Sequence, residues 1–151
     1  MVGQAEKGGH GAVKPVLDVH VITTEAVQFD AGAAGSVVMI PFHGTVTGTV
    51  FEGIVEPCGV DTQVVNAAGV RRMSARYMLT GHALPPYEGD CHIYIENNGW
   101  FSGTPSLPFT TVPTFLTDHE GLRKVLSRPF IGKGFVEEDG LHIRFWEAGK
   151  E

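Results

Sequence analysis

Four polar residues on neighbouring predicted strands have side chains that could do acid–base chemistry. Asp61 and Gln63 stand two positions apart, so they share one face of a strand that begins near Glu56. Arg76 and Asn97 lie on the next two predicted strands. If these side chains converge inside a barrel, Asp61 would move a proton and Arg76 would stabilise a developing enolate or oxyanion. Gln63 and Asn97 would orient a ligand carbonyl or hydroxyl.

The strand over residues 72–79 decides which groups face inward. Its side chains alternate, so Met73, Ala75 and Tyr77 share one face while Arg76 is on the other. The apolar face normally points inward, where Tyr77 would offer its phenol to a ligand carbonyl. Alternation therefore leaves two possibilities for Arg76, a place in the site or a structural position at the surface. The polar group as a whole could also be a buried network that fixes the strand register.

The histidines and cysteines give no sign of a metal or a cofactor. His43, beside a bend predicted at Gly44, is a candidate base and ligand-binding residue. No histidines stand at an HxH or HxxxH spacing, so no metal site is predicted. Cys58 and Cys91 form no CxxC motif and are expected to be reduced thiols. Phosphate loops and dinucleotide fingerprints are absent from the sequence, so no cofactor is predicted.

Composition bounds the class of protein and its partners. Of 151 residues, 42% are hydrophobic and 19% charged, and the 20 glycines and 9 prolines suit many strands joined by tight turns. The net charge of −6 gives no source of attraction to nucleic acid or an anionic membrane, so a small-molecule ligand is expected instead. Residues 1–13 lack the apolar core of a secretory signal. They are predicted to be a flexible leader, followed by a single domain over 14–151, in a cytoplasmic protein.

The coarse pattern of elements indicates an all-β fold. About eight strands follow one another between turn signals, which favours a closed or nearly closed antiparallel β-barrel. One helix is expected near Thr117 to Ser127, because Thr117 and Glu120 have capping-box spacing before the apolar stripe of Leu122 and Leu126. A lone barrel of this composition would expose apolar strand faces, so a homo-oligomer is predicted.

Several motifs, in this order, resemble the bacterial domain-of-unknown-function family 3237. They are Ile40-Pro-Phe-His-Gly-Thr-Val-Thr-Gly48, Pro57-Cys-Gly-Val-Asp-Thr-Gln63, Ala75-Arg-Tyr77, Ile93-Tyr-Ile-Glu-Asn-Asn-Gly99, Pro113-Thr-Phe-Leu-Thr117 and Phe130-Ile-Gly-Lys-Gly134. The resemblance implies a small antiparallel barrel like that of allene oxide cyclases, often oligomeric and without a generally established activity. Asp61, Gln63, Arg76, Tyr77 and Asn97 fall on matching positions. Cys58 and Thr62 depart from the family's usual glycine and tryptophan.

Two functions are consistent with these observations. The first is a small-molecule-binding barrel that acts as a cofactor-independent isomerase, cyclase or lyase on a carbonyl-bearing apolar or aromatic substrate. The second is a non-catalytic ligand-binding protein or an oligomeric structural protein. The orientation of Asp61 and Arg76 distinguishes the possibilities. If both side chains point into the barrel they can form a binding site, and if they point outward they are ordinary surface residues.

Overall fold

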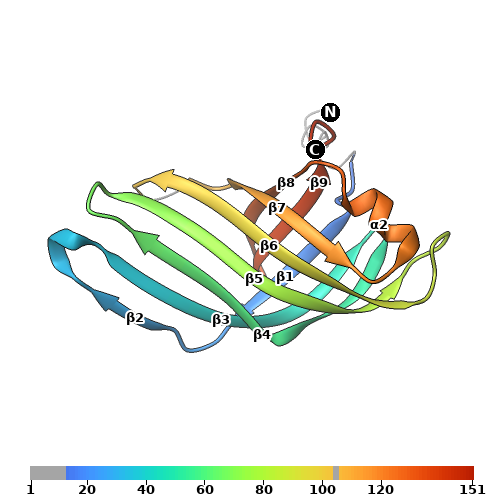
Figure 1. Ribbon diagram of the computed structural model, residues 1–151, viewed down its shortest axis with the longest axis horizontal. Coiled ribbons are helices and arrows are strands. Elements are labelled where there is room, and N and C mark those ends of the chain that lie inside the picture. The colour runs from blue at the N-terminus through green and yellow to red at the C-terminus, as the bar shows by residue number, and fades with distance from the viewer. Residues whose placement is uncertain (1–12, 104–105) are drawn as a thin grey trace.

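The computed structural model describes residues 13–103 and 106–151, and nine strands in this part of the chain form one antiparallel sheet (Figure 1). The strands are β1 (Leu17–Thr23), β2 (Val27–Asp30), β3 (Ser36–Gly48), β4 (Phe51–Val65), β5 (Val70–Ala83), β6 (Asp90–Ser102), β7 (Phe109–Thr117), β8 (Phe130–Glu137) and β9 (Gly140–Glu147). A short 3₁₀ turn, η1 (Gly32–Ala34), joins β2 to β3. Apart from Val13, the predicted leader over residues 1–13 lies outside the described residues.

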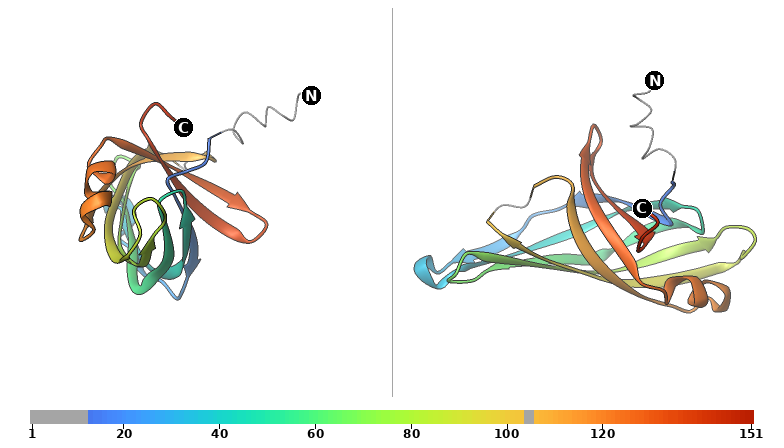
Figure 2. Two further views of the ribbon diagram at one scale, coloured as in Figure 1. Left: turned by 90° about the vertical axis from the view of Figure 1, so that its right-hand side faces the viewer. Right: turned by 90° about the horizontal axis from the view of Figure 1, so that it is seen from above.

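Eight of the strands close into a barrel, which confirms the predicted fold. Closure depends on β1, which pairs with β9 on one side and with the Phe42–Gly48 half of β3 on the other. The short β2 pairs with the opposite half of β3, from Ser36 to Met39, and extends the sheet beyond the ring. The left-hand view of Figure 2 shows the strands surrounding the barrel interior.

Tight approach between strands explains two of the glycines. Gly53 on β4 and Gly81 on β5 are directly opposite each other in the ladder. A Cβ atom on either glycine would collide with the main chain of the neighbouring strand, at Thr80 or Glu52. Glycine therefore lets the two strands coil around each other where the barrel curves.

The predicted helix is present as α2 (Glu120–Leu126), which lies on the outside of the barrel (Figure 2). Its apolar stripe buries Leu122 and Leu126 against the barrel. Within the described residues, no helix has the length and apolar character needed to cross a membrane.

The predicted cap of this helix is wrong. The N-cap residue is His119, whose Nδ1 accepts a hydrogen bond of 3.2 Å from the amide of Leu122. Thr117 is still part of β7, where it pairs with Ile93, and its hydroxyl donates instead to the main-chain oxygen of His92 at 2.8 Å. The sheet ladder thus holds Thr117 in extended backbone, two residues before the N-cap position, so Thr117 does not cap the helix.

The barrel interior has a packed half and an open half. Inward side chains of the packed half, such as Leu17, Val46 and Leu79, are almost completely buried and belong to the same cluster as the α2 leucines. Further along the same strands, inward positions such as Val21 on β1 and Ala75 on β5 line a cavity. The core and α2 therefore fill one end of the barrel and leave space at the other.

Candidate active site

A cavity of about 380 Å³ occupies the open half of the barrel. This volume is at the lower end of the roughly 300–1,000 Å³ typical of small-molecule sites. Most of its wall is apolar, with side chains that include Ile40, Phe42, Met73, Phe109, Leu141 and Ile143. Seven polar side chains interrupt this wall, namely those of Thr23, Asp61, Gln63, Arg71, Tyr77, Asn97 and Thr111. An apolar cavity with a few polar groups is the usual composition of a ligand site.

Strand register brings the polar groups together. Asp61 on β4, Ala75 on β5 and Asn97 on β6 are cross-strand partners in one row of the ladder. Partners in a row point to the same face of the sheet, and the small side chain of Ala75 leaves room between Asp61 and Asn97. Tyr77 is two residues beyond Ala75 on β5, so its ring projects into the same space.

A chain of hydrogen bonds orients the Asp61 carboxylate. Arg71 Nη1 donates to Gln63 Oε1 at 2.9 Å, and Gln63 Nε2 donates to Asp61 Oδ2 at 2.8 Å. Gln63 thus links the Arg71 guanidinium to the Asp61 carboxylate through two hydrogen bonds. The second carboxylate oxygen, Oδ1, is left without a protein partner.

Unpartnered polar atoms are concentrated in this cavity. Among the described residues, five buried side-chain atoms lack a hydrogen-bond partner, and all five belong to residues of the cavity wall. They are Asp61 Oδ1, Arg71 Nε, Tyr77 OH, Asn97 Oδ1 and Thr111 Oγ1. Because a buried polar atom without a partner costs about 1–3 kcal/mol, such atoms are rare in folded proteins. Their location in one apolar cavity makes this cavity the candidate site.

Burial shifts the protonation of the two central groups. Burial raises the pKa of the Asp61 carboxyl above its usual value, although the Gln63 hydrogen bond and the Arg71 charge partly offset the shift. Burial, and then the nearby Asp61 charge, raise the pKa of the Tyr77 phenol well above its usual range. Tyr77 therefore keeps its proton at neutral pH and can donate a hydrogen bond, while Asp61 is a stronger base than a solvent-exposed carboxylate.

The structure places four of the six predicted site residues in the cavity. Asp61, Gln63, Tyr77 and Asn97 all contribute to its wall, as expected if they converge inside the barrel. Their roles toward a ligand stay predictions.

Arg76 and His43 lie elsewhere, so the prediction that Arg76 stabilises charge beside Asp61 is wrong. Strand alternation turns the exposed Arg76 away from Tyr77 and onto the outer surface of the barrel, where it lines a groove with Arg72 and Ser74. His43 follows the inward Phe42 on β3 and takes no part in the cavity wall.

Three polar cavity residues, Thr23, Arg71 and Thr111, are not among those expected from the sequence. Arg71 belongs to the same alternating series as Met73 and Tyr77, so extending the inward face of the strand by two residues would have found it. Thr111 carries no comparable signal, since a threonine in a strand is common on either face.

Comparison with known proteins shows relatives of the same size and fold. A curated UPF0311 protein from Clostridium acetobutylicum is 30% identical over 125 residues, which are 72% of this chain and 75% of that protein. A crystal structure of a protein with unknown function from the same organism is 26% identical, with a TM-score of 0.70, and the match covers 87% of this chain and 94% of that chain.

A second similar structure is that of an enzyme from Penicillium herquei, with a TM-score of 0.62 over 88% of this chain and 96% of that chain. At 15% identity it shows a likeness of fold alone. The family described as protein of unknown function (DUF3237) matches residues 12–148, nearly the whole chain. The chain therefore belongs to the DUF3237 family, as its motifs indicate.

Proposed function

We propose that the protein binds a small carbonyl-bearing, largely apolar molecule in the barrel cavity and catalyses a proton transfer on it. The observation that carries this proposal is the concentration of five unpartnered polar atoms in one apolar cavity. A ligand with a polar group at one end and an apolar or aromatic body would satisfy those atoms and fill the remaining space.

The roles follow from the protonation states. Tyr77 is protonated and donates to the ligand carbonyl oxygen, which stabilises negative charge as it develops there. The free Oδ1 of Asp61 accepts a proton from a carbon or hydroxyl of the ligand. Gln63 and Arg71 hold the carboxylate in position through its other oxygen. Arg71 thus has the electrostatic role that the sequence assigned to Arg76.

Aromatic rings shape the apolar part of the site. Phe42 packs edge-on against Tyr77, with ring centroids 4.9 Å apart, which fixes the direction of the phenol. Phe109 and Met73 add polarisable surface to the cavity wall. This lining favours a flat or cyclic ligand over a flexible charged one.

The reaction class follows from a single base and a single donor. Asp61 can remove a proton and return it at another atom, so isomerisation, cyclisation or elimination fits and no cofactor is proposed.

The free thiols of Cys58 and Cys91 fit a reducing compartment, in agreement with the proposed cytoplasmic location.

The test is a ligand screen followed by matched variants. Small cyclic ketones, enones and phenols are screened by thermal shift, and turnover of each hit is followed by NMR. We expect D61N to abolish turnover while affinity changes by less than about tenfold. Y77F should lower kcat by about 10²–10³ if the phenol stabilises the developing charge.

Two control variants separate the cavity from the outer surface. Tyr94, on the outside of β6, donates a hydrogen bond to Glu96 at 3.0 Å. The variants R76Q and Y94F repeat, on the outside of β5 and β6, the side-chain changes that R71Q and Y77F make in the cavity. Both should retain full turnover, whereas R71Q should lose most of it. Binding that D61N and Y77F weaken, without turnover of any hit, would instead identify a non-catalytic binding protein. The site would be refuted by hits for which none of the cavity variants changes either affinity or turnover.

A further inference from the structure

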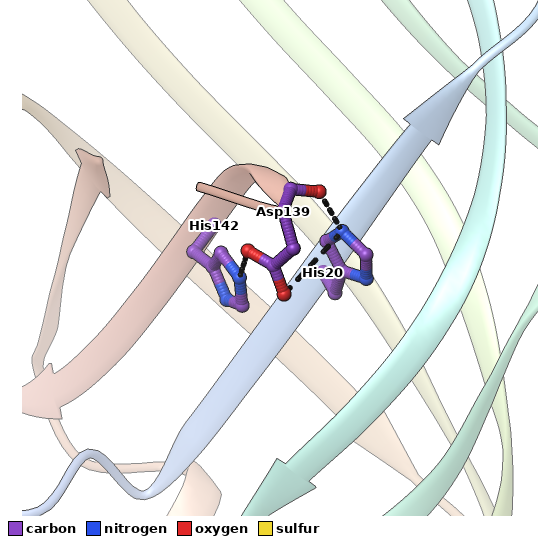
Figure 3. Close-up of side chains that lie close together, drawn as sticks. All are labelled: His20, Asp139 and His142. Carbon is purple, nitrogen blue, oxygen red and sulfur yellow. Dashed lines mark hydrogen bonds and ion pairs between the residues drawn. The ribbon is translucent and has the colours of Figure 1, made fainter. Parts of the chain in front are cut away.

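A second cluster of chemically active side chains lies on the outer surface of the barrel, where β1 meets β9 (Figure 3). His20 on β1 and His142 on β9 are directly opposite each other in the ladder, and their rings stack with centroids 4.9 Å apart. Asp139, in the turn between β8 and β9, reaches over both rings. One ligating atom from each residue lies within 4.8 Å of the other two.

Both imidazoles direct the same kind of atom at Asp139. His142 Nε2 lies 2.8 Å from Asp139 Oδ1. His20 Nε2 lies 2.7 Å from the main-chain oxygen of Asp139 and 3.9 Å from its Oδ2 (Figure 3). Two histidine nitrogens and a carboxylate that converge on one point form the ligand set of an open three-residue metal site.

A second carboxylate orients His142 as in known metal sites. His142 Nδ1 lies 2.8 Å from Asp18 Oδ1, and Arg144 Nε donates to Asp18 Oδ2 at 3.0 Å. Asp18 Oδ1 accepts the hydrogen of Nδ1, and without a metal Nε2 likewise donates to Asp139 Oδ1. Metal binding would replace the hydrogen on Nε2, while Asp18 continues to hold the ring through Nδ1. Histidine ligands usually have such a carboxylate partner on the other ring nitrogen.

We propose that His20 Nε2, His142 Nε2 and the Asp139 carboxylate bind one divalent transition-metal ion of the zinc class, with the remaining coordination positions open to water. Imidazole ligands favour Zn²⁺, Cu²⁺, Ni²⁺ or Fe²⁺ over Mg²⁺ and Ca²⁺, which prefer oxygen. Bond lengths of about 2.0–2.2 Å place the ligating atoms of a tetrahedral ion roughly 3.4 Å apart. Asp139 Oδ1, now 2.8 Å from His142 Nε2, must therefore move back slightly, and the more distant ligating atoms must approach by roughly 1 Å. Asp139 can make this movement because its side chain is 61% exposed.

The position of the site distinguishes it from the cavity. Val21 and Leu141, next in sequence to His20 and His142, point to the opposite face of the same strands and line the cavity. A metal here would not contact a cavity ligand. It would instead connect β1 to the β8–β9 hairpin at the seam that closes the barrel.

The experiment is a titration of the untagged, chelator-treated protein with Co²⁺, followed by competition with Zn²⁺. We expect one Co²⁺ per chain and the visible absorption of a four- or five-coordinate ion, which Zn²⁺ abolishes. H20Q and D139N should each weaken binding by at least about tenfold, and D18N, which removes the partner of His142, should weaken it by about 10–100-fold.

His92 provides the matched control. It also has its Nδ1 2.8 Å from a carboxylate, that of Asp118, but the three-residue cluster does not include it. H92Q should bind Co²⁺ with wild-type affinity. Circular dichroism and melting temperature establish that each variant is folded. The proposal is overturned if folded H20Q and D139N bind Co²⁺ as wild type does, if H92Q loses binding, or if the wild-type titration gives no saturable absorption.

Discussion

Asp61 combines a proposed catalytic role with a cost to folding. Its carboxylate lies in an apolar cavity, and one oxygen has no protein partner. Burial raises the pKa of this group, which means that the folded state binds its proton more tightly than the unfolded chain does. The ionised form therefore lowers the stability of the fold at neutral pH.

Replacement of Asp61 by Asn should consequently stabilise the protein. At pH 8 we expect D61N to raise the free energy of unfolding by about 0.5–2 kcal/mol, because the amide carries no charge to bury. This is the usual gain from a single stabilising substitution. The advantage should shrink as the pH falls through the raised pKa of the folded state, and it should vanish below the ordinary value of 3.8, where Asp61 is protonated in both states. Urea denaturation of both proteins at pH 8, 6 and 3 measures the difference.

D90N, at an exposed position, controls for the loss of one negative charge. It should leave stability unchanged within about 0.5 kcal/mol at each pH. A D61N variant less stable than wild type at pH 8 would show that the Gln63 and Arg71 interactions outweigh the cost of burial.

Individual site residues were predictable only where a strand pattern was unambiguous. Asp61 and Gln63 were found because both are polar and stand two apart, but the face of Arg76 depended on which side of its strand is inward. The pairing of His20 with His142 was beyond sequence reasoning, because it depends on the register of two strands more than 100 residues apart.

At the scale of elements, the pairing of β7 with β8 shapes the cavity. Phe109 on β7 lies opposite Gly134 on β8, and its ring covers the glycine. A Cβ atom at position 134 would overlap that ring. Because Phe109 also lines the cavity, the glycine allows the aromatic side chain to lie flat on the strand and leaves space for a ligand.

G134A should therefore displace the Phe109 ring toward the cavity. We expect a loss of about 1–3 kcal/mol in stability, the usual cost of overpacking, together with weaker ligand binding. Chemical denaturation and ligand titration measure the two effects. Adding F109L should restore part of the stability in the double variant, and a double-mutant cycle with additive effects would argue against the overlap.

Elements were predicted well where period-two alternation and turn residues agree. The strand over 72–79 and the helix near residue 120 are present because each carries a long, regular pattern. The bend predicted at Gly44 is instead a register shift inside β3, which runs without interruption from Ser36 to Gly48. Glycine signals both a strand end and a bulge, so the sequence alone does not separate them.

For the whole molecule, β2 leaves an edge that the barrel does not cover. Within residues 13–103 and 106–151, β2 is bonded to β3 alone, at the end of the strand order. Val27 and Phe29 on β2, with Met39 opposite Val27 on β3, share one face of the sheet and are 73%, 65% and 47% exposed. An exposed apolar edge strand is a template for pairing with another chain.

We expect the protein to be a homo-oligomer in solution that associates through β2. Light scattering after size exclusion should give a mass above that of one 16.2 kDa chain. F29S should shift the equilibrium to monomer, while L116S, which changes an equally exposed side chain on β7, should not. A monomeric wild-type protein at about 100 μM, a concentration at which micromolar contacts are saturated, would contradict this expectation.

The pairing of β1 with β9 also sets an order for folding. Val19 is among the first strand residues to be synthesised, yet its ladder partner Ile143 is in the last strand. The ring cannot close during translation until β9 has left the ribosome, and contacts so far apart in sequence form slowly. In the interval, β1 has an unpaired edge that neighbouring nascent chains can reach. Synthesis rate and chaperone supply should therefore govern the yield of this barrel more strongly than its final stability does.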